Sequence, residues 1–527
     1  MKVFFRIEYP ETNTKGKKES FGIHTANTEL LINLIRYSEV IEEYEVVVTD
    51  SKQKNALKEL HPNKTVRGHE FSDENELVEV LHYYDIFFIA GYDIYDILKC
   101  EPFFNRNLSV IGITHSLNSY EIAQSLRKAS GLCSRNEVLI CTSNTALGAV
   151  SKILGENSRL RLVTIPFGVD IKKYCSIDDS AKRDLRKRFN LPQKAIIFIY
   201  LGRLSPFSKT ELTPLIRAFA EIEKKSASGK EAFLLIVGRE HSVGYSRTLE
   251  ALAYSLGIQD RIKIVSSYDA SHIPLYYGAS DVFVSPSDNI QETFGLTVIE
   301  AMASGLPVIV SDWDGYRDTV VNGITGFLVP TYWADLGLTW QQTFLLGQSA
   351  AIDTDRLAQS MRILLEDPSC RKKMGDAGRR HVESKFTWRE VIRQYDELFS
   401  QLPGSREYHR QGIAQAKPSP VPLEPVRIFD GYPTRLVSDD FCIRVRDKNF
   451  LAYPTVLQWI DANVVNLVTK ELSKGPRMLG LITKALEDQH AIPVQRTILQ
   501  IIVMMKYGVL SPAEPAKDSV LNAALCK

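Results

Sequence analysis

Two glutamates in the middle of the chain have a spacing that suits the binding of a sugar. Glu292 precedes the segment 293–295, where a helix is expected to begin, and Glu300 lies inside that helix. On one continuous helix the two carboxylates would point about 80° apart, so a loop glutamate and a helix glutamate fit one pocket better. Carboxylates accept paired hydroxyl donors, which ribose and hexose diols offer. The alternative from spacing alone is that Glu292 caps the helix and Glu300 faces solvent.

The start of the same helix offers a binding site for an anion. Thr293, Phe294 and Gly295 stand at this point, and the first backbone N–H groups of a helix have no partner within it. Together with the positive end of the helix dipole, these groups can bind a phosphate or sugar hydroxyls.

A second loop supplies positive charge. Arg203 and Lys209 follow the apolar run 196–201, which is expected to be a buried strand, with Gly202 between the run and Arg203. Arginine offers planar bidentate donors and lysine a point charge, a combination that suits a diphosphate. The alternative is an ordinary polar loop between a strand and a helix.

A histidine follows another expected strand. His115 comes after the run 110–113, at the carboxyl end of that strand. There it can donate to a sugar hydroxyl or to a developing oxyanion. The alternative is a histidine that caps an element or packs at the edge of the core.

Two series of short apolar runs must position these residues. The runs are mostly continuous rather than alternating, which is typical of parallel strands covered on both faces. Helical patterns separate them, so the sequence predicts two doubly wound, Rossmann-like α/β domains, at 1–190 and 191–400, whose strand ends face one cleft. The first series of runs is 3–7, 46–48, 86–90, 110–113, 138–141 and 162–165, and the second is 196–201, 233–237, 262–265, 282–285 and 308–310.

The end of the chain has a different pattern. Residues 401–425 are rich in proline and polar residues, as in a linker. A small α-rich accessory module, resembling a winged helix in outline, is expected over 426–527. Its expected strands are 427–429 and 441–445, and its expected helices are 456–472, 477–486 and 494–507. The apolar stripe of the last helix forms the module's own core or a docking face; both interpretations stay open.

Composition excludes several classes of protein. The chain has 64 Lys and Arg against 63 Asp and Glu, so it lacks the overall excess of positive charge that is typical of nucleic-acid-binding proteins. No apolar run approaches the roughly 20 residues of a membrane span, and charge comes early in the chain, which predicts a cytoplasmic protein. The seven cysteines are dispersed without a C-x-x-C pair, so we expect reduced thiols and no zinc site. The D-x-D triplets at 312–314 and 353–355 are interpreted as coincidence, and no metal is expected.

Residues 1–400 resemble the retaining nucleotide-sugar glycosyltransferases of glycosyltransferase family 4, which have the GT-B fold. The resemblance rests on G-R-L at 202–204 with a following lysine, and on the E-x7-E pair Glu292 and Glu300, which continues as E-A-M-A-S-G-L-P-V. Further matches are I-P-F-G-V-D at 165–170, where the family usually has asparagine in third place, and F-T-W at 386–388. The helix after F-T-W typically crosses back to the first domain.

The resemblance implies roles for these residues. Arg203 and Lys209 would hold the donor diphosphate and stabilise the leaving nucleotide, Glu300 would bind the ribose hydroxyls, and Glu292 would contact the donor sugar. Phe294 and Gly295 would offer backbone N–H groups. Other implied contacts to the donor or its base are His115, Thr293, Gly238, the segment 266–268, and Gly22, which stands where the family has a glycine-rich loop.

The function that the resemblance implies is hexosyl transfer with retention of anomeric configuration and without a metal. The donor would be a UDP- or GDP-sugar, no cofactor would be required, and the acceptor would be a small molecule, a lipid-linked sugar or a polypeptide. Alternatives are another GT-B enzyme, such as a sugar-nucleotide epimerase or a phosphorylase, or a non-catalytic nucleotide-binding protein that works through its C-terminal module. Contact of the basic run 15–18 with a membrane surface and the oligomeric state are left open.

Overall fold

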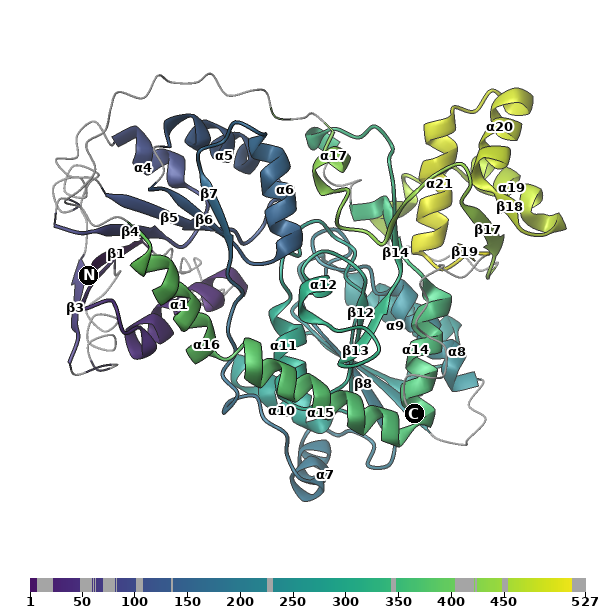
Figure 1. The fold of residues 1–527 in the computed structure, drawn as a ribbon. Coiled ribbons are helices and arrows are strands. Elements are labelled where there is room, and N and C mark those ends of the chain that lie inside the picture. Colours follow the sequence, from purple (N-terminus) through teal and green to yellow (C-terminus); the bar gives the residue numbers. More distant parts are fainter. Residues whose placement is uncertain are drawn as a thin grey trace. The chain divides into compact units, whose positions relative to one another are not determined.

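The computed structural model divides the chain into two compact units, which are described separately (Figure 1). The first comprises Met1–Asp170 and Ser384–Leu423, and the second Ile171–Glu383 and Glu424–Lys527. The expected module 426–527 therefore lies within the second unit, and most of the expected linker 401–425 lies outside the described residues. The structure describes residues 1–6, 22–47, 59, 61, 63–69, 81, 83–100, 108–133, 136–224, 231–342, 347–402, 421, 424–447 and 454–513.

The first unit is built on a seven-stranded sheet in the order β3-β2-β1-β4-β5-β6-β7. Every neighbouring pair is parallel, which confirms the first series of predicted strands. Strand β3 was not predicted, because only one of its five residues is strongly apolar. The strands are β1 (Lys2–Arg6), β2 (Glu43–Val47), β3 (Thr65–His69), β4 (Ile86–Ile89), β5 (Ser109–Ile113), β6 (Val138–Cys141) and β7 (Arg161–Thr164).

Local sequence signals fix the helices of this unit. Ser119 and Ser143 cap two of them by accepting hydrogen bonds from backbone N–H groups of the first turn. Helix α16 lies beside α1, although more than 350 residues separate them; Ser38 Oγ donates to Asp396 Oδ1 over 2.5 Å. The helices are α1 (Gly22–Tyr37), α4 (Ile94–Cys100), α5 (Tyr120–Leu132), α6 (Asn144–Leu154) and α16 (Trp388–Ser400).

The second unit contains a six-stranded parallel sheet in the order β10-β9-β8-β11-β12-β13. Three of the predicted strands, 196–201, 262–265 and 282–285, are found with the expected bounds. The strands are β8 (Ile196–Leu201), β9 (Ala232–Val237), β10 (Ile262–Val265), β11 (Val282–Ser285), β12 (Val308–Ser311) and β13 (Gly326–Val329). The helices are α7 (Asp179–Arg188), α8 (Thr213–Lys224), α9 (Tyr245–Ser255), α10 (Ile273–Ala279), α11 (Leu296–Ala303), α12 (Tyr316–Thr319), α14 (Thr354–Glu366) and α15 (Pro368–Lys385).

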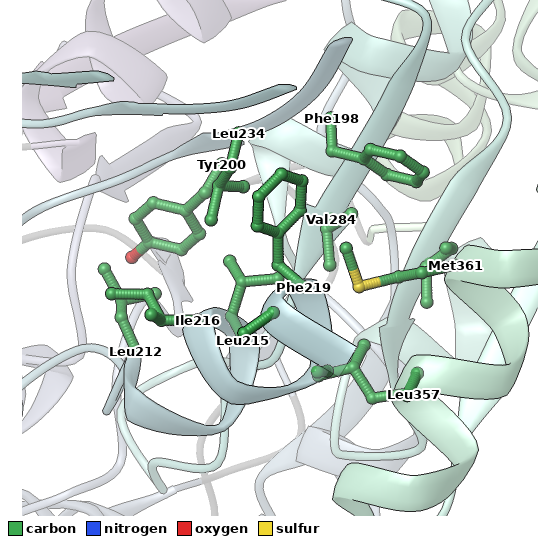
Figure 2. Packing of buried hydrophobic residues seen from close by; sticks show 14 of the residues in the cluster. Phe198, Tyr200, Leu212, Leu215, Ile216, Phe219, Leu234, Val284, Leu357 and Met361 are labelled. Atoms are coloured by element: carbon green, nitrogen blue, oxygen red, sulfur yellow. The ribbon is translucent and has the colours of Figure 1, made fainter. Parts of the chain in front are cut away.

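An apolar core fixes helices α8 and α14 on this sheet. Figure 2 shows Phe219 of α8 gathered with Val284 of β11 and Met361 of α14, and all three are fully buried. Burying side chains of this size stabilises the folded state by about 1.5–3 kcal/mol each. The sheet is therefore held rigidly below the loops that follow its strands.

The C-terminal part of the second unit packs on the rest of that unit through two small sheets. One joins β14 to β15 and β16, and the other has the order β18-β17-β19. The helices at 462–471, 479–490 and 494–506 share one apolar core with both sheets. The elements are β14 (Thr331–Ala334), β15 (Ala350–Ile352), α17 (Val426–Phe429), β16 (Arg435–Val437), β17 (Cys442–Val445), α18 (Pro454–Leu457), α19 (Ala462–Glu471), β18 (Arg477–Met478), α20 (Leu479–His490), α21 (Val494–Lys506) and β19 (Leu510–Pro512).

Some predictions for this region were wrong. Residues 427–429 were predicted as a strand but belong to helix α17, which begins after Pro425, a residue with helical backbone angles. The predicted helix 456–472 is broken between α18 and α19, because Asp461 caps a new helix with its side chain. Gly508 ends α21 with a φ of 71°, as predicted.

Two further findings bear on the expectations from composition. Within the described part of the chain, no helix combines the length and apolar character that crossing a membrane requires. Cys133, Cys141, Cys175 and Cys442 are free thiols, in line with the expectation of reduced thiols for these four residues.

Candidate functional site

The loop after β8 holds both predicted cations. Arg203 Nη2 donates to the carbonyl oxygen of Ser208 over 3.4 Å, which lays the guanidinium along the loop. The loop is closed by turns in which the N–H groups of Ser208 and Lys209 bond to Ser205. A Cβ on Gly238, at the end of β9, would lie 1.8 Å from the carbonyl oxygen of Gly202. Gly238 is therefore required for the close approach of two strand ends.

The loop after β11 is fastened to the loop after β8. Ser287 Oγ donates to the carbonyl oxygen of Lys209 over 3.2 Å, and Asn289 Nδ2 donates to that of Phe207 over 2.6 Å. Trp313 Nε1 donates in turn to the carbonyl oxygen of Asn289 over 3.0 Å. Two loops that follow neighbouring strands thus form one hydrogen-bonded structure at the carboxyl edge of the sheet, where ligands bind in open α/β sheets.

These contacts bring Lys209 and Glu292 together. Lys209 Nζ forms a charge-assisted hydrogen bond with Glu292 Oε2, and the two side chains are 20% and 10% exposed. Tyr316 OH lies 3.5 Å from the same carboxylate oxygen and 2.8 Å from Ser285 Oγ. Burial and the nearby Glu292 raise the pKa of Tyr316, so its hydroxyl keeps its proton and remains a donor.

The start of α11 is shaped by a glycine. Gly295 stands before the helix with a φ of 90°, and a Cβ there would lie 2.2 Å from the ring of Tyr316. Its neighbours Thr293 and Phe294 are buried. Glu292 therefore lies in the loop and Glu300 within the helix, the arrangement that the spacing favoured. This placement leaves the first N–H groups of α11 at the same strand edge as Lys209.

Glu300 is oriented by a tyrosine of another helix. Tyr277 OH, from α10, donates to Glu300 Oε2 over 3.0 Å. Burial, together with the charge of Glu300, raises the pKa of Tyr277, which keeps the phenol protonated. One carboxylate oxygen is thus held by a fixed donor. A carboxylate oriented in this way suits the recognition of a diol, which presents two hydroxyl donors together.

Aromatic and basic side chains follow β9 and β10. The Arg239 guanidinium lies 5.9 Å from the centre of the Tyr268 ring, within the range of cation–π attraction. Burial raises the pKa of Tyr268, and the charge of Glu300 acts in the same direction. Tyr268 therefore lies near enough to Glu300 for the two side chains to interact electrostatically. It belongs to the segment 266–268, which was predicted to flank a base.

The other predicted residues lie in the first unit. His115 follows β5, and its ring stacks on Phe167 with the centroids 5.5 Å apart and the planes at 15°. Phe167 is the residue that departs from the asparagine usual in the family's motif. Gly22 is the first residue of α1, and the basic run 15–18 lies outside the described residues.

Neither D-x-D triplet forms a ligand set. Asp312 pairs with Arg317 over 3.0 Å and accepts from Thr434, and burial raises the pKa of Asp314. Asp353 caps α14 by accepting the N–H of Arg356, while Asp355 pairs with Arg446. No cluster of three or more His, Cys, Asp or Glu suited to a metal ion occurs among the residues that the structure describes.

Sequence reasoning missed three side chains that shape the site. Tyr277 and Tyr316 hold the two glutamates, and Lys506 contacts the loop before Glu292 from the far end of the chain. Tyr277 lies in an apolar segment, where an aromatic residue normally indicates only a core position, and Tyr316 lies in a short polar helix without a recognisable motif. No spacing within the sequence links Lys506 to a segment 218 residues away.

The part of the chain that matches a family model lies in the second unit. Residues 181–339 match the family model described as glycosyl transferases group 1. D-inositol 3-phosphate glycosyltransferase of Corynebacterium efficiens is 28% identical over 245 residues, 46% of this chain and 51% of that protein. The enzyme of the same name from Corynebacterium urealyticum is 27% identical over 289 residues, 53% of this chain and 61% of that protein. The matches thus span about half the length of these curated relatives.

Solved structures show the same architecture over more of the chain. The Anabaena protein HepE in complex with UDP has a TM-score of 0.57 and 20% identity, covering 76% of this chain and all of that one. Sucrose-phosphate synthase from Thermosynechococcus elongatus has a TM-score of 0.54 and 22% identity, covering 76% of this chain and 99% of that one. With its two Rossmann-like halves, the chain has the GT-B fold.

Proposed function

We propose that the protein is a glycosyltransferase that moves a hexose from a nucleoside-diphosphate sugar to an acceptor hydroxyl with retention of configuration. The proposal rests chiefly on the pairing of Lys209 with Glu292 beside the start of α11. Positive charge, the first N–H groups of a helix and carboxylate oxygens that can accept from hydroxyl groups then stand at one strand edge. These are the groups that a diphosphate joined to a sugar needs.

The donor diphosphate would lie against Arg203 and Lys209, with the first N–H groups of α11 on its other oxygens. Glu300, held by Tyr277, would accept the two ribose hydroxyls. Glu292 would accept hydroxyls of the hexose. The base would stack near Tyr268. HepE was crystallised with UDP and with UDP-glucose, which makes UDP-glucose the first donor to test.

In the reaction, the bond from the anomeric carbon to the diphosphate oxygen breaks and the leaving group takes the electron pair. The acceptor oxygen forms the new bond on the same face, and its proton passes to the departing phosphate oxygen. Arg203 and Lys209 would stabilise the charge that develops on that oxygen. These cations and the dipole of α11 would do so without an added metal. His115 would donate to the hexose.

The test is the release of nucleoside diphosphate by the purified full-length chain. UDP-glucose, other UDP-hexoses and GDP-mannose would be supplied with a panel of acceptors, beginning with D-inositol 3-phosphate because the curated relatives carry that name. We expect release with one donor only when an acceptor is present, and loss of release in Lys209→Ala. Interconversion of the donor sugar without an acceptor would indicate an epimerase instead. Failure of the parent to bind any nucleoside diphosphate would overturn the proposal.

A further inference from the structure

The end of helix α21 is buried against the loop that leads to Glu292. Lys506, the last residue of the helix, is fully buried; its Nζ hydrogen-bonds Asp288 Oδ2, and the carbonyl oxygen of Ala350 lies 3.2 Å away. Asp288 is 2% exposed and lies in the loop after β11, four residues before Glu292. Burial raises the pKa of Asp288 to about 6, although Lys506 favours its carboxylate form. A lysine at a helix end normally reaches solvent, so this placement is unusual.

The next residue reaches the other loop of the site. Tyr507 OH lies 3.4 Å from Gln348 Oε1, and Gln348 Nε2 donates to the carbonyl oxygen of Pro206 over 3.2 Å. Pro206 stands between Arg203 and Lys209. Two consecutive residues of the C-terminal segment are therefore connected to both loops that carry the predicted donor-binding side chains.

Other contacts fix this segment within the second unit. Arg446 bonds Glu221 of α8 and Asp355 of α14, each over 2.7 Å. Arg217 of α8 bonds Asp447 over 2.6 Å. Figure 1 shows α21, drawn in yellow, beside β14 of the same unit. The helix end is therefore anchored on the core of the unit and can hold the loops in place.

The segment after α17 supports the loop before Glu292 through Trp313. The N–H of Asp314 donates to the carbonyl oxygen of Tyr432 over 3.1 Å, and the rings of Tyr432 and Trp313 meet edge to face. Trp313 in turn bonds Asn289, between Asp288 and Glu292. The C-terminal region is thus connected to the loop before Glu292 directly through Lys506 and indirectly through Trp313.

We propose that Lys506 and Tyr507 are positioning residues of the donor site, so that the C-terminal region belongs to the donor-binding machinery. The inference rests on the proposed function and names a further part of the same site. Lys506 holds the loop 286–292 and Tyr507, through Gln348, holds the loop 202–209. Together they set the distance at which Lys209 and Glu292 meet. Neither residue touches the substrate itself.

The experiment compares binding of UDP or GDP, measured by calorimetry, and the donor KM of the full-length chain and three variants. Tyr507→Phe keeps the ring and removes only the hydroxyl. Lys506→Met leaves Asp288 without its cation, and Lys506→Met with Asp288→Asn removes the buried charge while leaving the link broken. Arg496→Gln, on the exposed face of α21, is the control. Because an unpaired buried carboxylate destabilises the fold, melting temperatures are recorded for every variant.

We expect the nucleotide Kd and the donor KM to rise three- to tenfold in Tyr507→Phe and about tenfold in the double variant, with the acceptor KM unchanged. If the role of Lys506 is purely structural, the double variant should regain both the melting temperature and the donor KM that Lys506→Met loses. If Lys506 positions the loop, the double variant should regain the melting temperature but keep the raised donor KM. Donor affinities like the parent's in both Tyr507→Phe and the double variant would overturn the inference and leave the proposed function intact. A parent that binds no nucleoside diphosphate would overturn both.

Discussion

Lys209 and Glu292 form an ion pair, although 83 residues of sequence separate them. The pair joins the loop after β8 to the loop before α11, so that a cation and a carboxylate share one strand edge. Lysine carries three donors, and the bond to Glu292 uses one of them. The other two can serve an anion, while Glu292 keeps acceptor positions for hydroxyl groups.

Removal of either cation should slow sugar transfer more than it weakens acceptor binding. We expect kcat to fall on the order of 10²–10³ in Arg203→Ala and in Lys209→Ala, because charge on the leaving oxygen develops in the transition state. Steady-state release of nucleoside diphosphate measures this. Lys194→Ala, an exposed residue just before β8, is the control and should keep the parent's rate. Parent-like rates in both site variants would show that the cations have been misplaced.

Glu300 should bind the ribose hydroxyls of the donor nucleotide. In Glu300→Ala we expect UDP or GDP to bind about 10- to 100-fold more weakly, because two hydrogen bonds to a charged group are lost. The corresponding 2′,3′-dideoxynucleoside diphosphate should bind parent and variant alike in calorimetry. Tyr277→Phe should have a smaller effect in the same direction, since Tyr277 only orients the carboxylate. An equal loss for both nucleotides would argue against ribose contact.

Substitution by alanine should be unfavourable for two reasons at Gly295 and for one reason at Gly244. Both glycines precede a helix with positive φ, 90° and 83°, so alanine is strained at either position by about 1–2 kcal/mol. A Cβ at Gly295 would in addition meet Tyr316, whereas Gly244 has open space. We therefore expect Gly295→Ala to lower both stability and donor affinity, and Gly244→Ala to lower stability alone. Chemical denaturation and calorimetry give the two quantities, and equal effects at both positions would contradict the clash.

Stability should depend on pH through Asp353. Burial raises the pKa of this carboxyl to about 6, above its value in the unfolded chain, so folding favours the protonated form. The stabilising contribution is complete at low pH and is lost as the pH rises through 6. Relative to Asp353→Asn, which keeps a capping oxygen, the free energy of unfolding of the parent should fall by about 1 kcal/mol from pH 5 to pH 7.5. Asp178→Asn, at the exposed cap of α7, is the control for the replacement of a capping carboxylate.

Sequence reasoning reached the architecture because the signals involved are local. Continuous apolar runs such as Val282–Ser285 identify parallel strands, and the segment 293–295 marks the start of α11. It failed at 427–429, because three residues are too few to show a period and a helix can equally well begin after Pro425. It also could not place Lys506 against Asp288, since that contact depends on how the C-terminal helix packs on the unit. Orientation of Glu300 by Tyr277 is likewise a tertiary effect.

The most direct measurement is the calorimetric affinity of the full-length chain for UDP and for uridine, or for GDP and guanosine, in the parent and in the variant Arg203→Ala with Lys209→Ala. We predict that the parent prefers the diphosphate by at least about 100-fold, as two charge-assisted contacts of about 1.5–3 kcal/mol each require. The preference should fall below about tenfold in the variant. A parent that binds diphosphate and nucleoside alike, or a preference that survives the loss of both cations, would contradict the claim that this loop holds the donor diphosphate.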